Sequence, residues 1–169
     1  MNQMLQFSTR YAELITTNQG LTMFKHILVP TDGSKFALKA LDMAAKMAAS
    51  TDAKVSVLYV SSVYPTMVGG DGYMVMPITP KDWNVSVAKH AALVREKIEK
   101  HAKLKSLTVQ FLNVTVDQPY VGIIDTAMRK KCDVIVMASH GRSGLSALLL
   151  GSETTKVLTH CKLPVLVCR

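Results

Sequence analysis

The residues best suited to chemistry lie near the C-terminus, where two glycines and a serine precede a predicted helix. Nine residues separate Gly141 from Gly151, and Ser152 follows directly. The first turn of a helix carries backbone N–H groups without partners and a partial positive charge, which together suit a phosphate group. Glycine lets the backbone approach such a ligand closely. This spacing therefore predicts a phosphate-binding site at the start of the helix.

The other candidates for catalysis or metal binding form no recognisable set. His140 could act as an acid or base near neutral pH, but no nucleophile is identifiable beside it. The remaining histidines are scattered over strand and helix ends. The three cysteines, Cys132, Cys161 and Cys168, lack the spacing of paired metal ligands. We expect no catalytic residue and no metal site, and we expect the cysteines to be reduced packing residues.

Two well-known phosphate-binding loops are missing from the sequence. It contains no G-x-x-x-x-G-K-[ST] loop, and so lacks the lysine that contacts the phosphates in P-loop proteins. The turn Thr31-Asp32-Gly33-Ser34 also differs from the Ser-Gly-Gly phosphate loop of ATP pyrophosphatases. The sequence therefore gives no indication of a fast nucleotide hydrolase, although slow ATP hydrolysis is left open.

Strand and helix patterns alternate from residue 24 onward. Apolar or β-branched runs predict strands, and segments with one apolar face at helical period predict helices. The expected strands are 26–30, 54–60, 108–116, 134–137 and 163–167, and the expected helices begin after Ser34 and span 82–105, 119–130 and 151–160. This alternation predicts an α/β fold with an open, twisted parallel sheet between two layers of helices.

Ligands in such sheets bind beyond the carboxyl ends of the strands, where the strand order reverses. Two segments compete for that place, namely the turn at 31–34 after the first strand and the loop at 139–150 after the fourth.

The fold is expected to occupy residues 23–169. Residues 1–22 are polar with weak periodicity, which favours a disordered leader or a weak helix outside the domain. Residues 61–81 contain three glycines and three prolines, which indicates a long, mobile loop between the second strand and the second helix.

The chain carries a formal net charge of +8, with 49% apolar and 19% charged residues. Its basic residues are spread along helical faces with glutamates between them, a pattern typical of a solvated surface. We therefore expect no membrane association, disfavour nucleic-acid binding, and relate the charge to an anionic small ligand. With no secretory signal or membrane-spanning run in the sequence, the expected location is the cytoplasm.

Three segments in order resemble the universal stress protein family, in its ATP-binding, UspA-like branch. The segment Ala138 to Ser152 is similar to the family's nucleotide loop, which reads glycine, two residues, glycine, nine residues, then glycine and serine or threonine. The run 27–34 resembles its first strand and turn, and 164–167 its last strand. The resemblance implies a Rossmann-like fold of the adenine nucleotide alpha hydrolase-like type, with strand order 3-2-1-4-5. One departure is Ala138, which stands where the pattern has its first glycine.

The resemblance also implies a set of nucleotide-binding residues. Asp32 would face the adenosine end, Val60 would meet adenine through its main chain, and Gly151 would hold the phosphates. The full set is Pro30, Thr31, Asp32, Val60, Met137, Ala138, His140, Gly141, Arg142, Gly151, Ser152, Glu153 and Thr154. Simpler roles remain open, because Asp32 could stabilise its own turn, Ser152 could cap the helix, and Glu153 could point away from the phosphates.

The expected function is a regulatory stress-response module that binds ATP, or ADP or AMP, with Mg²⁺ as an optional partner of the phosphates. Family resemblance implies a homodimer through the C-terminal strand Leu163 to Val167, which would otherwise be an unpaired sheet edge. The alternatives are a structural dimer that binds no nucleotide and a slow ATPase.

Overall fold

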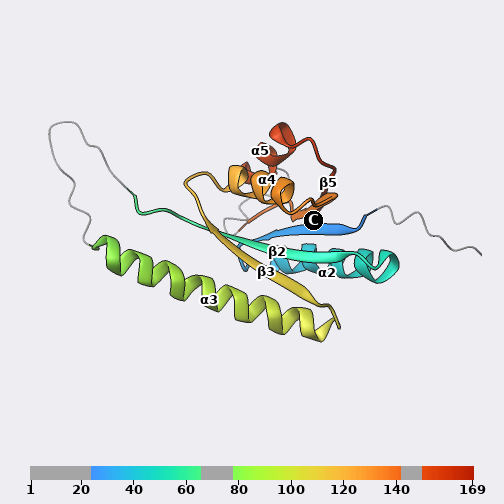
Figure 1. Cartoon of the computed structure of the whole chain (residues 1–169), viewed down its shortest axis with the longest axis horizontal. Helices are drawn as coiled ribbons and strands as arrows, with labels where there is room; N and C mark the ends of the chain where they lie inside the picture. The colour runs from blue at the N-terminus through green and yellow to red at the C-terminus, as the bar shows by residue number, and fades with distance from the viewer. Residues whose placement is uncertain (1–23, 66–77, 142–149) are drawn as a thin grey trace, which may run out of the picture.

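Five parallel strands form one open sheet in the order β3-β2-β1-β4-β5 (Figure 1). This computed structural model describes residues 24–65, 78–141 and 150–169. The strands are β1 His26–Thr31, β2 Lys54–Ser61, β3 Val109–Thr115, β4 Val134–Ala138 and β5 Val165–Cys168, and the helices are α2 Lys35–Thr51, α3 Pro80–Leu104, α4 Pro119–Arg129 and α5 Ser152–His160. The predicted α/β class and strand order are confirmed.

The described helices cover both faces of the sheet, with α2 and α3 on one face and α4 and α5 on the other (Figure 1). Alternate side chains of the central strand β1 enter the two layers, because successive residues of a strand point to opposite faces. Ile27 and Val29 pack with α2 and α3, whereas Leu28 packs with α4 and α5. All three are fully buried, so the core continues through the sheet.

Two predicted boundaries are wrong. The last strand begins at Val165 and not at Leu163, because Pro164 has no N–H to donate and contributes only its carbonyl, which accepts from the N–H of Ile135 at 3.0 Å. Helix α3 begins at Pro80, two residues before the predicted start. Its N-cap Thr79 accepts from the N–H of Asp82 at 3.1 Å, and proline suits the first helical position.

Some predictions concern segments outside the described residues. These are the leader 1–22, most of the predicted loop 61–81, and Arg142. None of the helices in the described part of the chain is long and apolar enough to cross a membrane.

The turn after β1 has a backbone that only glycine adopts readily. Gly33 has φ +76°, and a Cβ built there would lie 3.2 Å from Cγ2 of Val94 on α3. The Gly33 carbonyl accepts from Nζ of Lys97 on the same helix at 2.6 Å. Next to it, the Ser34 side chain accepts from the N–H of Ala37 and caps α2. Helix α3 thus supports the turn that carries Asp32.

We predict that Gly33→Ala lowers the free energy of unfolding by about 1–2 kcal/mol, the usual cost of a left-handed conformation for a residue with a Cβ. Urea denaturation followed by circular dichroism measures it. Ser50→Ala, at an exposed position near the end of α2, is the control and should leave the midpoint within error of wild type. Equal midpoints for all three proteins would contradict this account of the turn.

Candidate functional site

A cavity of about 490 Å³ opens at the carboxyl edge of the sheet. It lies where the strand order reverses, between the ends of β1 and β4, which is where ligands bind in open α/β sheets. Its lining includes every predicted site residue within the described part of the chain, namely Pro30, Thr31, Asp32, Val60, Met137, Ala138, His140, Gly141, Gly151, Ser152, Glu153 and Thr154. The structure therefore brings together residues that are up to 124 positions apart in sequence, as the predicted topology requires.

The end of β1 provides a carboxylate that is fixed by its own turn. Oδ1 of Asp32 accepts from the N–H of Ser34 at 2.9 Å, and Oγ1 of Thr31 accepts from the N–H of Gly33 at 3.1 Å. Asp32 therefore has the turn-stabilising role that the sequence left open. Its other oxygen, Oδ2, lies 3.2 Å from where a Cβ on Gly141 would stand, so the turn and the β4 loop meet at the cavity.

The start of α5 is bound to the end of β4 by two short hydrogen bonds. The N–H of Gly151 donates to the Ser139 carbonyl at 2.7 Å, and the hydroxyl of Thr154 donates to the Ala138 carbonyl at 2.9 Å. Gly151 has φ −58°, which any residue can adopt, but a Cβ there would lie 3.2 Å from the Ser139 carbonyl oxygen. The need for glycine at this position is therefore steric and comes from the β4 backbone.

No side chain among the described residues caps the first turn of α5. Gly151 is the N-cap residue and makes no side-chain bond, while Ser152 is the first helical residue, so the interpretation of Ser152 as the cap is wrong. The N-termini of the other described helices each receive a side-chain oxygen. Ser34 caps α2, Thr79 caps α3, and a carboxylate oxygen of Glu153 accepts from the N–H of Tyr120 in α4. Of these four N-termini, only that of α5 receives no side-chain oxygen from the described residues, and it borders the cavity.

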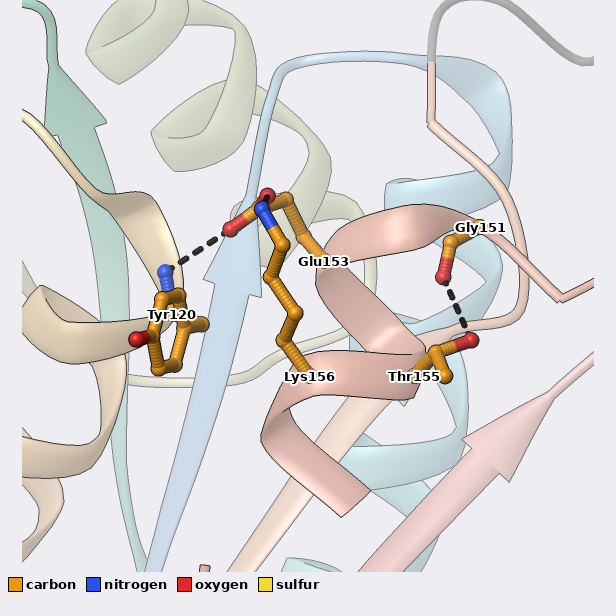
Figure 2. A network of polar contacts seen from close by, with 5 residues as sticks. All are labelled: Tyr120, Gly151, Glu153, Thr155 and Lys156. Atoms are coloured by element: carbon orange, nitrogen blue, oxygen red, sulfur yellow. Dashed lines mark hydrogen bonds and ion pairs between the residues drawn. The ribbon is translucent and has the colours of Figure 1, made fainter. Parts of the chain in front are cut away.

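Glu153 faces α4 as well as the cavity. Its Oε2 accepts from the N–H of Tyr120 at 2.8 Å, and its Oε1 accepts from Nζ of Lys156 at 2.9 Å (Figure 2). That hydrogen bond raises the pKa of the exposed Lys156 ammonium. Both carboxylate oxygens are therefore engaged by partners within the protein.

His140 and the cysteines add no nucleophile to the site. Nδ1 of His140 hydrogen-bonds the Ser139 hydroxyl at 2.9 Å, but Ser139 is only 1% exposed and cannot reach a substrate. Burial raises the pKa of the Cys132 thiol to about 11 and also raises that of Cys168, so both stay protonated at neutral pH. Among the described residues, Nε2 of His140 is buried without a hydrogen-bond partner, which leaves one polar group at the cavity unsatisfied.

The sequence analysis missed the apolar wall of the cavity. Its members come from the starts of α2 and α4, the end of β2 and the approach to α5, and they are Ala37, Leu58, Tyr59, Pro119, Ile123 and Leu150. The sequence alone does not set the register of β1 and β2, and in the structure Pro30 pairs with Leu58, so the carboxyl ends of the two strands are level. Pro119 follows β3 and so belongs to the same edge of the sheet.

The fold is an open parallel α/β domain with a cavity at the reversal of its strand order. The chain belongs to the universal stress protein family, whose sequence profile matches residues 23–169. It is 30% identical over 154 residues to universal stress protein MJ0531 of Methanocaldococcus jannaschii, a match that covers 89% of this chain and 85% of the relative. It is 31% identical over 150 residues to universal stress protein YxiE of Bacillus subtilis, covering 87% of this chain and all of the relative.

Solved structures of the family share the fold. UspA from Lactobacillus plantarum matches with a TM-score of 0.73 at 22% identity, over 86% of this chain and 97% of that one. A universal stress protein in complex with cAMP matches with a TM-score of 0.63 at 22% identity, over 87% and 98% of the two chains. A family member from Arabidopsis thaliana with AMP bound matches with a TM-score of 0.57 at 14% identity, over 85% and 90%. The Rossmann-like architecture predicted from the resemblance is confirmed.

We predict that Thr154→Val lowers the free energy of unfolding by about 1–3 kcal/mol, since it leaves the buried Ala138 carbonyl without its donor. Thr154→Ser keeps the hydroxyl and should recover most of the loss. Thr159→Val, at an exposed position of the same helix, should change stability by less than about 0.5 kcal/mol. Chemical denaturation of the three variants measures these effects, and a loss shared equally by Thr154→Val and Thr154→Ser would show that the hydroxyl is unimportant.

Proposed function

We propose that this chain binds an adenine nucleotide in the cavity at the carboxyl edge of its sheet and acts in the cytoplasm as a regulatory stress-response module. The observation that carries the proposal is the first turn of α5, which borders the cavity and receives no side-chain cap from the described residues. Its N–H groups and the helix dipole suit phosphate. Structures of related proteins with cAMP and with AMP give independent support for an adenine nucleotide.

The cavity has two chemically different sides that fit the two ends of a nucleotide. Leu58, Val60 and Ile123 offer apolar surface for a base, and the first turn of α5 from Ser152 onward offers backbone N–H groups for phosphates. A volume of about 490 Å³ falls in the range typical of small-molecule sites. The Asp32 carboxylate, at the end of β1, is suited to accept hydrogen bonds from ribose hydroxyls.

Ala138 is compatible with this arrangement. It is almost fully buried, its carbonyl is held by Thr154, and its methyl group is the smallest change from the family's glycine. Mg²⁺, where it accompanies the phosphates, would be held mainly by the nucleotide, since the described residues contain no group of three or more His, Cys, Asp or Glu that could hold a metal ion. We propose binding as the function, with ATP, ADP and AMP as the candidate ligands. No observation here favours the slow hydrolysis left open by the sequence.

The β5 edge supports the proposal of a homodimer. β5 pairs with β4 on one side only, and Leu166 on it is 39% exposed. Unpaired edges are commonly covered by a second copy or by charged residues, and here the edge is apolar. Pairing of two β5 strands about a twofold axis would extend the sheet through both subunits.

We predict that wild-type protein, stripped of copurifying ligand, binds ATP or AMP with micromolar affinity in isothermal calorimetry. Gly151→Ala should weaken binding roughly tenfold or more, because its Cβ presses on the Ser139 carbonyl and shifts the N–H donors away from the phosphates. Thr159→Val is the matched control on the same helix. The absence of heat and of thermal stabilisation at millimolar nucleotide with Mg²⁺ would overturn the proposal in favour of a structural dimer.

The variant Asp32→Ala tests which end of the nucleotide this carboxylate contacts. We predict weaker binding of ATP and AMP but unchanged binding of inorganic tripolyphosphate, since the carboxylate is proposed to contact the ribose. Competition of each anion against a fluorescent nucleotide analogue measures the difference. An equal loss of affinity for nucleotide and tripolyphosphate would show that Asp32 supports the site as a whole and does not contact the adenosine part of the ligand.

We predict that Leu166→Lys shifts the protein from dimer to monomer in multi-angle light scattering at micromolar concentration, because two lysines would meet across the twofold axis. Leu166 is preferred to Val165, which packs against the α4 and α5 layer and whose replacement would also disturb the core. A monomeric wild type would contradict the dimer while leaving the nucleotide site in place.

A further inference from the structure

We propose that Glu153 of α5 is the N-terminal cap of α4, and that through this contact it is a positioning residue for the cavity and does not itself contact the ligand. The effect on nucleotide affinity rests on the proposed function. The capping role rests on the geometry alone. The two parts can therefore be tested separately.

Helix α4 has no cap of its own. Its N-cap residue Gln118 makes no side-chain hydrogen bond, and Pro119 at the first position has no N–H. The first donor of the helix is therefore the N–H of Tyr120, and it donates to Oε2 of Glu153, which is 33 residues away. A carboxylate at this position also meets the positive end of the helix dipole.

Further contacts join the same two helices beside this hydrogen bond. Nζ of Lys156 donates to Oε1 of Glu153 at 2.9 Å and lies 5.5 Å from the centre of the Tyr120 ring. The Tyr120 ring also lies 5.3 Å from that of His160 at the end of α5. Figure 2 shows the Glu153 and Lys156 side chains reaching from α5 toward Tyr120. The Glu153 carboxylate lies at the centre of this contact and is only partly exposed.

The contact fixes the relative position of two sides of the cavity. Pro119 and Ile123 of α4 line one side, and Gly151 and Ser152 at the start of α5 line another. Glu153 is one residue beyond Ser152, and its bond to Tyr120 is one residue beyond Pro119. A change at this contact is therefore transmitted to both sides, although both oxygens of Glu153 are already occupied by protein donors.

The arrangement also removes an electrostatic conflict. A carboxylate in the first turn of α5 would compete with an anion for the N–H groups there. The α4 N-terminus and Lys156 hold the Glu153 carboxylate and offset its charge. The first turn of α5 thus keeps its N–H groups available.

The test compares Glu153→Ala, Glu153→Gln and Lys156→Met with wild type. Glu153→Gln keeps an oxygen that accepts from Tyr120. Lys156→Met removes an exposed ion pair and the contact of the ammonium with the Tyr120 ring, both of which contribute little at an exposed position, and it leaves the hydrogen bond between Glu153 and Tyr120 in place. We expect Glu153→Ala to lower the melting temperature by roughly 2–4 °C and to weaken ATP and AMP binding by the same factor, roughly three- to tenfold. Glu153→Gln and Lys156→Met should stay close to wild type in both measurements.

Hydrogen exchange of the Tyr120 amide supplies a readout that needs no ligand. Exchange should be fast in Glu153→Ala and slow in the other three proteins. Slow exchange in Glu153→Ala would overturn the capping role, whether or not nucleotide binds. Tighter ATP binding in both Glu153 variants, with AMP unchanged, would show instead that the carboxylate faces the phosphates. A lowered melting temperature with unchanged affinity would overturn the positioning role. If wild type binds no nucleotide, the proposed function fails and the exchange result alone decides the cap.

Discussion

The backbone of Ser139 is the connection on which the candidate site depends. Its carbonyl accepts from the N–H of Gly151, and its own N–H donates to the carbonyl of Cys168, both at 2.7 Å. Ser139 is almost fully buried, and hydrogen bonds shielded from water are costly to break. One residue therefore joins the end of β4, the end of β5 and the start of α5.

Two hydrogen bonds to the end of β4 hold the start of α5 in place. The helix begins where β4 ends because Gly151 and Thr154 bond to the last carbonyls of the strand region. Since β4 is fully buried between β1 and β5, these bonds tie the N-terminus of α5 to the core of the protein. The edge of the cavity formed by the start of α5 is therefore attached to the sheet, and a rigid scaffold of this kind is common for binding sites.

Much of this architecture is readable from the sequence, because the signals are local. Apolar runs such as Val134 to Met137 identify strands, and the spacing of Gly141 and Gly151 predicts the edge of the sheet at which the cavity lies. The features that were missed depend on register and packing. Ile123 reaches the cavity only because α4 lies on a particular face of the sheet, and the N–H partner of Glu153 is a residue 33 positions away. The sequence left open whether Ser152 caps α5, because Gly151 and Ser152 are both favourable at that position, and the N-cap is Gly151.

The placement of negative charge is compatible with the proposed anionic ligand, although two carboxylates line the cavity. Asp32 bonds the N–H of Ser34, at the N-terminus of α2, and Glu153 bonds the N–H of Tyr120, at the N-terminus of α4. Each carboxylate thus lies against the positive end of a helix, where its charge is partly offset. Three described helices, α2, α4 and α5, contribute residues near their N-termini to the cavity. Carboxylates of the chain accept hydrogen bonds at the N-termini of two of them, α2 and α4. The third, α5, is bound to β4 through Gly151 but receives no acidic side chain from the described residues. Among the described residues, the N-terminus of α5 is therefore the one of the three that no carboxylate bonds, which supports the proposal that a phosphate binds there.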